Sequence, residues 1–154
     1  MTPTAHVIAS ALTSAAFAAA TQSWEGVVAC FLSGIFIDID HHFDVWIYRK
    51  KILFHIKHIY DFCEKEKGGR LYLMFHSYEL LAAFWMCIIF FHLSTIWLGV
   101  AVGLSVHLLL DQWGNTKCVN PWTYFLWYRL KNNFSKEAIF SPEFYRTLHQ
   151  QRYP

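Results

Sequence analysis

Four groups of histidine and carboxylate residues stand at the ends of apolar segments in this sequence. They begin with a lone histidine and continue in the runs GIFIDIDHHFD, MFHSYEL and VHLLLDQWGN, and the members are His6, Asp38, Asp40, His41, His42, His76, Glu79, His107 and Asp111. Imidazole and carboxylate groups together suit zinc, iron or manganese. A metal site of this kind with an open coordination position also suits hydrolysis. The residue types therefore predict a metal site.

The spacing within each group indicates which side chains share a helix face. His107 and Asp111 are four residues apart, and the histidine and glutamate of MFHSYEL are three apart, so each pair lies on one face. Asp38 and Asp40 are about 200° apart on an ideal helix. Only one of these two carboxylates can point into a helical bundle unless the helix ends there, and the charged residues that follow favour such an end.

The apolar segments that must position these residues predict membrane-spanning helices. Of the 154 residues, 55% are hydrophobic and 16% are charged, whereas a soluble domain carries about 25% charged residues. Four apolar segments, extended by their flanking residues, approach the roughly 20 residues that cross a bilayer. We expect one all-α, polytopic membrane domain over 1–154, with two helical hairpins and spans at about 5–22, 25–41, 76–92 and 94–112.

The distribution of basic residues predicts the orientation of these spans. None of the thirteen Lys and Arg residues lies before Arg49 or between Arg70 and Lys117. By the positive-inside rule, the loop 43–75, the tail 113–154 and both termini are cytoplasmic, as in a multi-pass inner-membrane protein. Because no basic residue precedes the first segment, we expect it to be a retained helix and not a cleaved signal peptide. This topology gathers all four groups at the cytoplasmic ends of the spans.

Each of these residues also has an ordinary structural explanation. His6 could be a polar residue at a helix end, Asp38 and Asp40 could end a helix in water, and the His107–Asp111 pair could join two helices by a hydrogen bond. Independent structural roles would scatter such residues over both membrane faces. Their predicted convergence at one face favours the metal site.

Amphipathic segments lie outside the predicted spans. The segment 43–65 alternates aromatic and basic residues and is typical of an interfacial helix, whose His55 and His58 we expect to be solvated. The segment after Asp111 holds three of the seven Trp residues, and it either forms a rim over the site or anchors the tail to the bilayer. The spacing of Gly99 and Gly103 predicts close helix packing.

The order of the motifs resembles a known family. A histidine near the start, DIDH after the second apolar segment, HS before the third and HxxxD in the fourth are similar to the bacterial inner-membrane metal-dependent hydrolases, often described as LexA-regulated. The ligand order is also similar to that of zinc-dependent phospholipase C and P1 nuclease. The resemblance covers most of the chain and implies metal ligands at His6, Asp38 or Asp40, His76, His107 and Asp111. The predicted position of His41 and His42 at the same membrane face makes them further candidates.

These observations predict a membrane-embedded hydrolase with one or two metal ions, first of all zinc, with manganese or iron as alternatives. Glu79, or whichever of Asp38 and Asp40 does not bind metal, would be the general base. A site at headgroup level predicts a membrane lipid as substrate, most readily a phosphoester. The phosphate would be bound by the forked side chain of Arg70, Arg49 or Arg129.

Two other functions would use the same residues. A non-enzymatic metal carrier or transporter would bind the ion without hydrolysing a lipid. A haem protein with two axial histidines is a third function, which the carboxylates argue against. The net charge of +2 gives no basic field of the kind that marks a nucleic-acid-binding protein.

Overall fold

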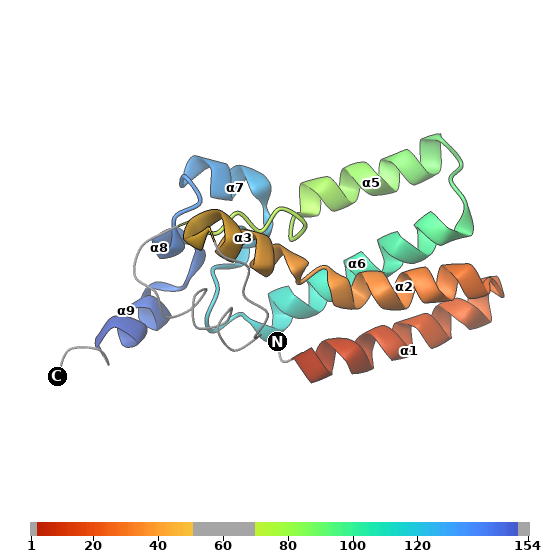
Figure 1. Ribbon diagram of the computed structural model, residues 1–154, viewed down its shortest axis with the longest axis horizontal. Helices are drawn as coiled ribbons and strands as arrows, with labels where there is room; N and C mark the ends of the chain where they lie inside the picture. Colours follow the sequence, from red (N-terminus) through yellow and green to blue (C-terminus); the bar gives the residue numbers. More distant parts are fainter. Residues whose placement is uncertain (1–2, 51–69, 151–154) are drawn as a thin grey trace. The chain divides into compact units, whose positions relative to one another are not determined.

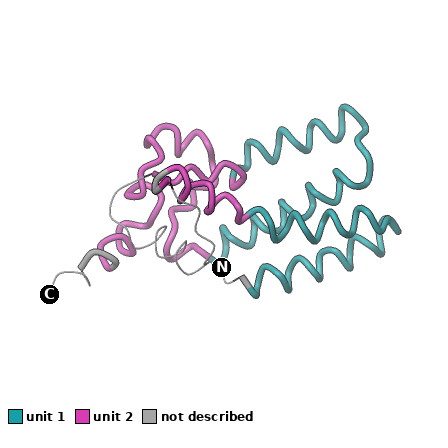
Figure 2. Tube along the Cα trace, viewed as in Figure 1, with its two compact units in different colours: residues 1–37, 77–114 teal, residues 38–76, 115–154 magenta. Residues whose placement is uncertain are grey.

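The computed structural model describes residues 3–50 and 70–150, and these form helices joined by turns (Figure 1). The described part of the chain contains no strand, only isolated bridges that pair Arg70 with Ser135 and Val119 with Phe140. The predicted all-α class is therefore confirmed. The chain divides into two compact units, with 1–37 and 77–114 in unit 1 and 38–76 and 115–154 in unit 2 (Figure 2).

Unit 1 consists of four apolar helices, which are α1 (Pro3–Thr21), α2 (Trp24–Phe36), α5 (Tyr78–Phe90) and α6 (Thr95–Gly114). The helices α1, α2 and α6 pack against one another, and α5 packs against α6 (Figure 1). The hydroxyl groups of Ser23 and Ser77 accept hydrogen bonds from the backbone N–H groups of Gly26 and Leu80, so they cap the first turns of α2 and α5.

Glycine residues bring α2 and α6 into direct backbone contact. A Cβ added at Gly99 would lie 2.1 Å from the Gly26 carbonyl oxygen, and one at Gly103 would lie 2.3 Å from the carbonyl oxygen of Cys30. Only residues without a side chain fit at these two positions. The close packing predicted from Gly99 and Gly103 is therefore present, and its partner is the row of small residues on α2 formed by Gly26, Cys30 and Gly34.

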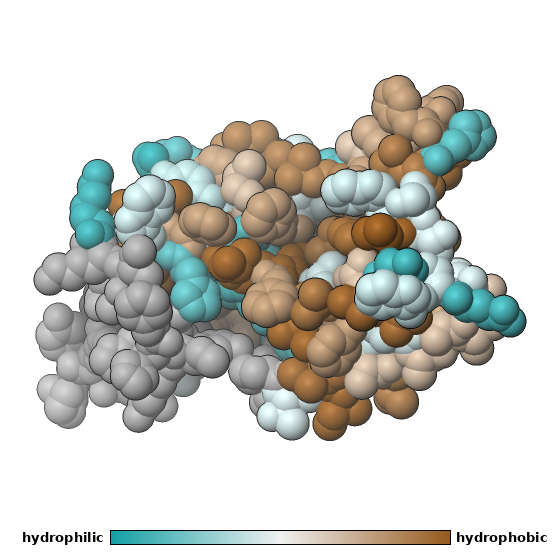
Figure 3. Space-filling model, turned by 45° about the vertical axis from the view of Figure 1, so that its right-hand side comes forward, coloured by the Kyte–Doolittle hydropathy of each residue, from teal (hydrophilic) through white to brown (hydrophobic). Residues whose placement is uncertain are grey.

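Three stretches of the described chain are long and apolar enough to cross a membrane: Thr4–Thr21, Trp24–Ile47 and Thr95–Gly114. Large apolar side chains such as Leu12 and Trp113 are exposed. Figure 3 shows many apolar side chains on the face of the molecule that it presents. The predicted membrane character is thus confirmed for three segments. The fourth, α5, has 13 residues, so it is about 20 Å long against a hydrocarbon core of about 30 Å.

The second apolar segment breaks earlier than predicted. We expected one span over 25–41, but α2 ends at Phe36, and α3 (Ile39–Arg49) begins after a turn at Ile37 and Asp38. The apolar composition alone did not indicate this break, because Ile37 and Ile39 continue the hydrophobic pattern. The expected interfacial helix is helical over the part that belongs to α3, and 51–69, with His55 and His58, lie outside the described residues.

In its described residues, unit 2 combines α3 with four short helices, which are η2 (Pro121–Tyr124), α7 (Leu126–Lys131), α8 (Lys136–Ile139) and α9 (Pro142–Gln150). Its apolar core takes side chains from α3, from the segment before α5 and from the α8 region, namely Val45, Leu71, Leu73, Ile139 and Phe140. The backbone N–H of Leu71 also donates to the Phe134 carbonyl. The core therefore fixes the segment that leads to His76.

Candidate metal-binding sites

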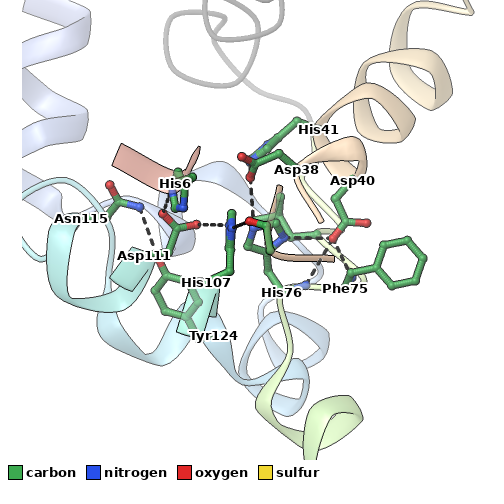
Figure 4. A network of polar contacts seen from close by, with 12 residues as sticks. His6, Asp38, Asp40, His41, Phe75, His76, His107, Asp111, Asn115 and Tyr124 are labelled. Atoms are coloured by element: carbon green, nitrogen blue, oxygen red, sulfur yellow. Dashed lines mark hydrogen bonds and ion pairs between the residues drawn. The ribbon is translucent and has the colours of Figure 1, made fainter. Parts of the chain in front are cut away.

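The first candidate site, which we call the unit 1 triad, consists of His6, His107 and Asp111. The Asp111 carboxylate lies 3.1 Å from His6 Nε2 through Oδ1 and 3.3 Å from His107 Nε2 through Oδ2 (Figure 4). The two imidazole rings stack with their centroids 4.0 Å apart. All three side chains are buried, with exposed fractions of 2–6%. The structure therefore brings together the predicted residues at the start of α1 and the end of α6.

The backbone of α2 determines the protonation of His107. Its Nδ1 lies 2.8 Å from the carbonyl oxygen of Gly34, and because a carbonyl only accepts hydrogen bonds, Nδ1 must carry the proton. In the neutral ring, Nε2 then presents a lone pair to the negatively charged Asp111 Oδ2. These two groups attract each other only if a proton or a metal cation lies between them. A backbone carbonyl on the other ring nitrogen is the usual partner of a metal-binding histidine.

Close helix packing positions this contact. The absence of a side chain at Gly34 lets α1 approach, since a Cβ there would lie 2.4 Å from Ser10 Oγ. One turn before Ser10 on α1 stands His6, so the same approach delivers that imidazole to Asp111. At this end of unit 1, the Tyr78 hydroxyl also donates to the Gln112 side chain, which ties α5 to α6.

The second candidate site lies in unit 2 around His76. Its Nδ1 is 3.1 Å from Asp40 Oδ2, and its Nε2 is 3.5 Å from Asp38 Oδ1 (Figure 4). His76 and Asp40 are buried, with exposed fractions of 3% and 2%, whereas Asp38 is half-buried. Both carboxylates can approach the same imidazole because the helix α2 ends before them and a turn precedes α3. A helix end at this point was the condition under which Asp38 and Asp40 could both point to one site.

The two carboxylates have different positions relative to His76. Asp40 Oδ2 also accepts the backbone N–H groups of Phe75, at 2.6 Å, and His76, at 3.2 Å. Because this oxygen already accepts two backbone N–H groups, it acts as an acceptor towards the imidazole as well, so the proton of the ring belongs on Nδ1. His76 Nε2 then faces Asp38 with its lone pair, as His107 faces Asp111 in unit 1. We call Asp38 and His76 the unit 2 pair.

A third carboxylate, Asp44, which was not among the predicted residues, supports the loop that carries His76. Asp44 Oδ1 accepts the backbone N–H of Tyr72 at 3.0 Å, and Oδ2 accepts that of Leu73 at 3.3 Å. Asp44 is four residues after Asp40, a spacing that places two acids on one face of α3 and that could have indicated it. On the other side of the loop, Arg129 Nη1 donates to the His76 carbonyl oxygen at 2.9 Å.

The remaining predicted residues lie in varied surroundings. Glu79 is in the first turn of α5 and accepts the Ser77 hydroxyl at 2.9 Å. His41, half-buried, has its Nε2 4.0 Å from Asp38 Oδ1, and the neighbouring His42 is also half-buried. Among the predicted phosphate-binding residues, Arg70 is exposed, Arg129 is buried, and the side chain of Arg49 lies outside the described part. Their catalytic and substrate-binding roles stay predictions.

The fold and these side chains define the class of protein. Over residues 3–50 and 70–150 it is helical, and three helical segments of this part are long and apolar enough to cross a membrane. Its potential metal ligands include His107 and Asp111 in unit 1 and Asp38 and His76 in unit 2. The chain matches no family model, no curated protein and no solved structure. The resemblance to the inner-membrane hydrolases therefore stays a prediction.

Proposed function

We propose that this protein is a membrane-embedded, metal-dependent hydrolase that acts on a lipid phosphoester. One observation carries the proposal. Two buried imidazoles, His107 and His76, have Nδ1 on an acceptor and Nε2 on a carboxylate at 3.3 and 3.5 Å. This arrangement requires a cation or a proton at Nε2 in both places. Neutral imidazole nitrogen and carboxylate oxygen are the donors that zinc prefers at hydrolytic sites.

The unit 1 triad fits such an ion by the chemistry of its donors. Within unit 1, His107 and Asp111 belong to the side chains whose ligand atoms lie close enough to hold one ion, and they leave coordination positions open. His107 would bind through Nε2, and Asp111 would bind through its carboxylate and neutralise part of the charge. His6, stacked on the His107 ring, stays a further candidate ligand. A divalent metal bound there would polarise a phosphoryl oxygen and acidify water. Manganese and iron accept the same donors.

The other residues would bind the substrate and move protons. In unit 1, Glu79 has a carboxylate placed at the start of α5, and it stays our candidate for the general base. In unit 2, Arg70 is exposed and can offer a forked pair of N–H groups to a phosphate. Helical segments that can cross a membrane make a membrane lipid the substrate class we favour, with an inner membrane as its location.

Metal analysis of the detergent-purified protein tests the proposal. We expect one or two ions per chain in the wild type, and the count distinguishes a single metal centre from two. Asp111→Ala should lose metal and activity together. His92→Asn is a matched control, because His92 is exposed and Asn tolerates its left-handed backbone at φ 47°. Full metal retention in Asp111→Ala would contradict the assignment of the unit 1 triad.

The activity assay uses mixed micelles of phosphatidylglycerol or phosphatidic acid and measures release of the water-soluble product. Hydrolysis should depend on the added metal and disappear in Asp111→Ala. Metal binding without hydrolysis of any lipid would instead favour a carrier. Within unit 1, the buried polar residues of α1 stop at Ser14, and the buried Phe17 lies one turn further on. This apolar block argues against a path for ions along α1.

The stacked rings in unit 1 also bear on the haem alternative. Two axial histidines bind haem iron from opposite faces of the porphyrin. His6 and His107 instead stack directly, with an angle of 17° between the ring planes, and both direct Nε2 to the same carboxylate. We therefore favour a bare metal ion at the unit 1 triad over a haem.

A further inference from the structure

The loop 72–76 is held by two carboxylates of one helix. Asp40 and Asp44 are four residues apart on α3, both are 2% exposed, and each accepts two backbone N–H groups of this loop. Asp44 holds the start of the loop, at Tyr72 and Leu73. Asp40 holds its end, including His76. Four backbone N–H groups of the loop therefore find hydrogen-bond acceptors on the helix α3.

The backbone within the loop is strained at the residue that Asp44 binds. Leu73 has φ 47°, in the left-handed region, and a non-glycine residue keeps such an unfavourable conformation only where its surroundings impose it. The same residue is buried in the apolar core of unit 2, and its carbonyl oxygen accepts the N–H of His76 at 3.1 Å. The conformation of Leu73 thus sets the direction in which the chain delivers His76.

We infer that Asp44 is a positioning residue for the His76 imidazole. By binding the N–H groups of Tyr72 and Leu73, it stabilises the left-handed turn, and the turn places His76 with Nδ1 on Asp40 and Nε2 towards Asp38. The hydrogen bonds of Asp44 go to the loop backbone and not to the imidazole, so Asp44 acts through the loop. This role rests on the proposed function only in that His76 is taken as a metal ligand.

A carboxylate, and not merely a polar residue, suits this position. Both oxygens of Asp44 accept an N–H group, whereas an asparagine has one oxygen, and its amide would direct N–H donors at a backbone N–H donor. Asp44→Asn therefore preserves the side-chain volume and removes one of two hydrogen bonds. The loop should relax from the left-handed turn and release the imidazole from its fixed direction.

Two measurements test the role of Asp44. The first is hydrogen exchange of the loop amides in the purified protein without added metal. Asp44→Asn should accelerate exchange at Tyr72 and Leu73 most strongly, whereas Asp40→Asn should do so at Phe75 and His76. The second is titration with Zn²⁺ or Co²⁺, in which Asp44→Asn should weaken the binding that depends on His76 by about 10- to 100-fold, as is typical of lost outer-shell support.

Matched variants separate positioning from general damage. Glu143→Gln makes the same chemical change at an exposed acid of α9 in unit 2 and should change neither measurement. Asp44→Glu keeps the charge but displaces it by one methylene, so it should give an intermediate loss of affinity if Asp44→Asn fails to fold. Unchanged metal affinity in folded Asp44→Asn, beside a wild type that binds through His76, would overturn the inference.

The inference and the proposed function fail in different ways. If His76→Ala keeps the full metal content and affinity, His76 is not a ligand and the proposed role of the unit 2 pair is wrong. The exchange experiment still decides the role of Asp44 in that case. Faster exchange at Tyr72 and Leu73 that spreads to His76 supports positioning through the loop, and exchange that does not change in Asp44→Asn contradicts it.

Discussion

Replacing Asp111 with asparagine distinguishes a metal cation from a proton between the side chains of the unit 1 triad. The carboxylate faces His6 Nε2 at 3.1 Å and His107 Nε2 at 3.3 Å, and it is 6% exposed. The substitution keeps the volume and removes the charge. If a metal binds there, its affinity for the site falls. If the carboxylate pairs with a protonated imidazole, the substitution breaks a buried ion pair.

The two cases differ in what the substitution lowers: the affinity for metal in the first, and the stability of the metal-free protein in the second. An interaction that involves a charged group contributes about 1.5–3 kcal/mol, so losing two such interactions costs about 3–6 kcal/mol, or about 10²- to 10⁴-fold in metal affinity. In the metal-free protein the amide of the introduced asparagine can donate to His107 Nε2, so we expect no loss of stability there. Breaking a buried ion pair would instead cost about 3–5 kcal/mol without any metal.

Thermal unfolding in detergent, with and without metal, is the assay. At a free metal concentration about 100 times the wild-type Kd, binding stabilises the protein by about 2.7 kcal/mol, which raises Tm by about 5–11 °C for a chain of this size. A variant with 100-fold weaker binding would gain about 0.4 kcal/mol, or roughly 1 °C.

The reasoning would be refuted by either of two results. One is an Asp111→Asn variant that keeps the full metal-induced rise in Tm. The other is a metal-free variant that unfolds about 6–20 °C below the metal-free wild type, which is the shift expected from a broken ion pair. Glu25→Gln is the control, because Glu25 is an exposed acid of unit 1, and it should behave as the wild type in both conditions.

Three further predictions concern the support of the site. Gly103→Ala should destabilise unit 1 by about 1–3 kcal/mol, because the new Cβ would lie 2.3 Å from the Cys30 carbonyl oxygen. Thermal unfolding, with Val102→Ala as the control variant, measures this loss, and an unchanged Tm would contradict the prediction. Gly34→Ala should weaken metal binding by about 10- to 100-fold, since it displaces the carbonyl that accepts from His107 Nδ1. Titration with Zn²⁺ measures this loss, and a variant that keeps the affinity of the wild type would contradict the prediction. Ser77→Ala should remove the cap of α5 at a cost of about 1 kcal/mol and leave the metal content unchanged, so a loss of metal would show that Ser77 has another role.

Two features of the fold were predictable because they depend on composition and local spacing. The long apolar segments poor in charged residues indicated membrane-compatible helices, and three helical stretches of the described chain are long and apolar enough to cross a membrane. The i,i+4 spacing placed His107 and Asp111 on one helix face, and the structure shows them in contact. Such properties follow from the helical repeat and from the cost of burying charge, and neither requires knowledge of the neighbouring elements.

The break between α2 and α3 was not predictable in the same way. The residues Ile37 and Ile39 continue an apolar pattern, and only the contacts of Asp40 and Asp44 with a loop some 30 residues later in the chain give α3 its role. A hydrogen bond between a side chain and a distant backbone N–H leaves no periodic signal in the sequence. The i,i+4 spacing could have placed Asp44 on the same helix face as Asp40, but not its contacts with the loop, and both Asp38 and Asp40 remained open as ligands.

The sequence by itself determined which chemical groups are present and near which helix ends they stand: imidazoles and carboxylates at the ends of apolar segments. Only the tertiary structure decided which atoms of these groups face each other. The Gly34 carbonyl fixes the proton of His107 on Nδ1, and Asp40 does the same for His76. The physical reason is that an imidazole has two chemically different nitrogens. Their roles are assigned by the partner in space, and that partner comes from another helix or loop.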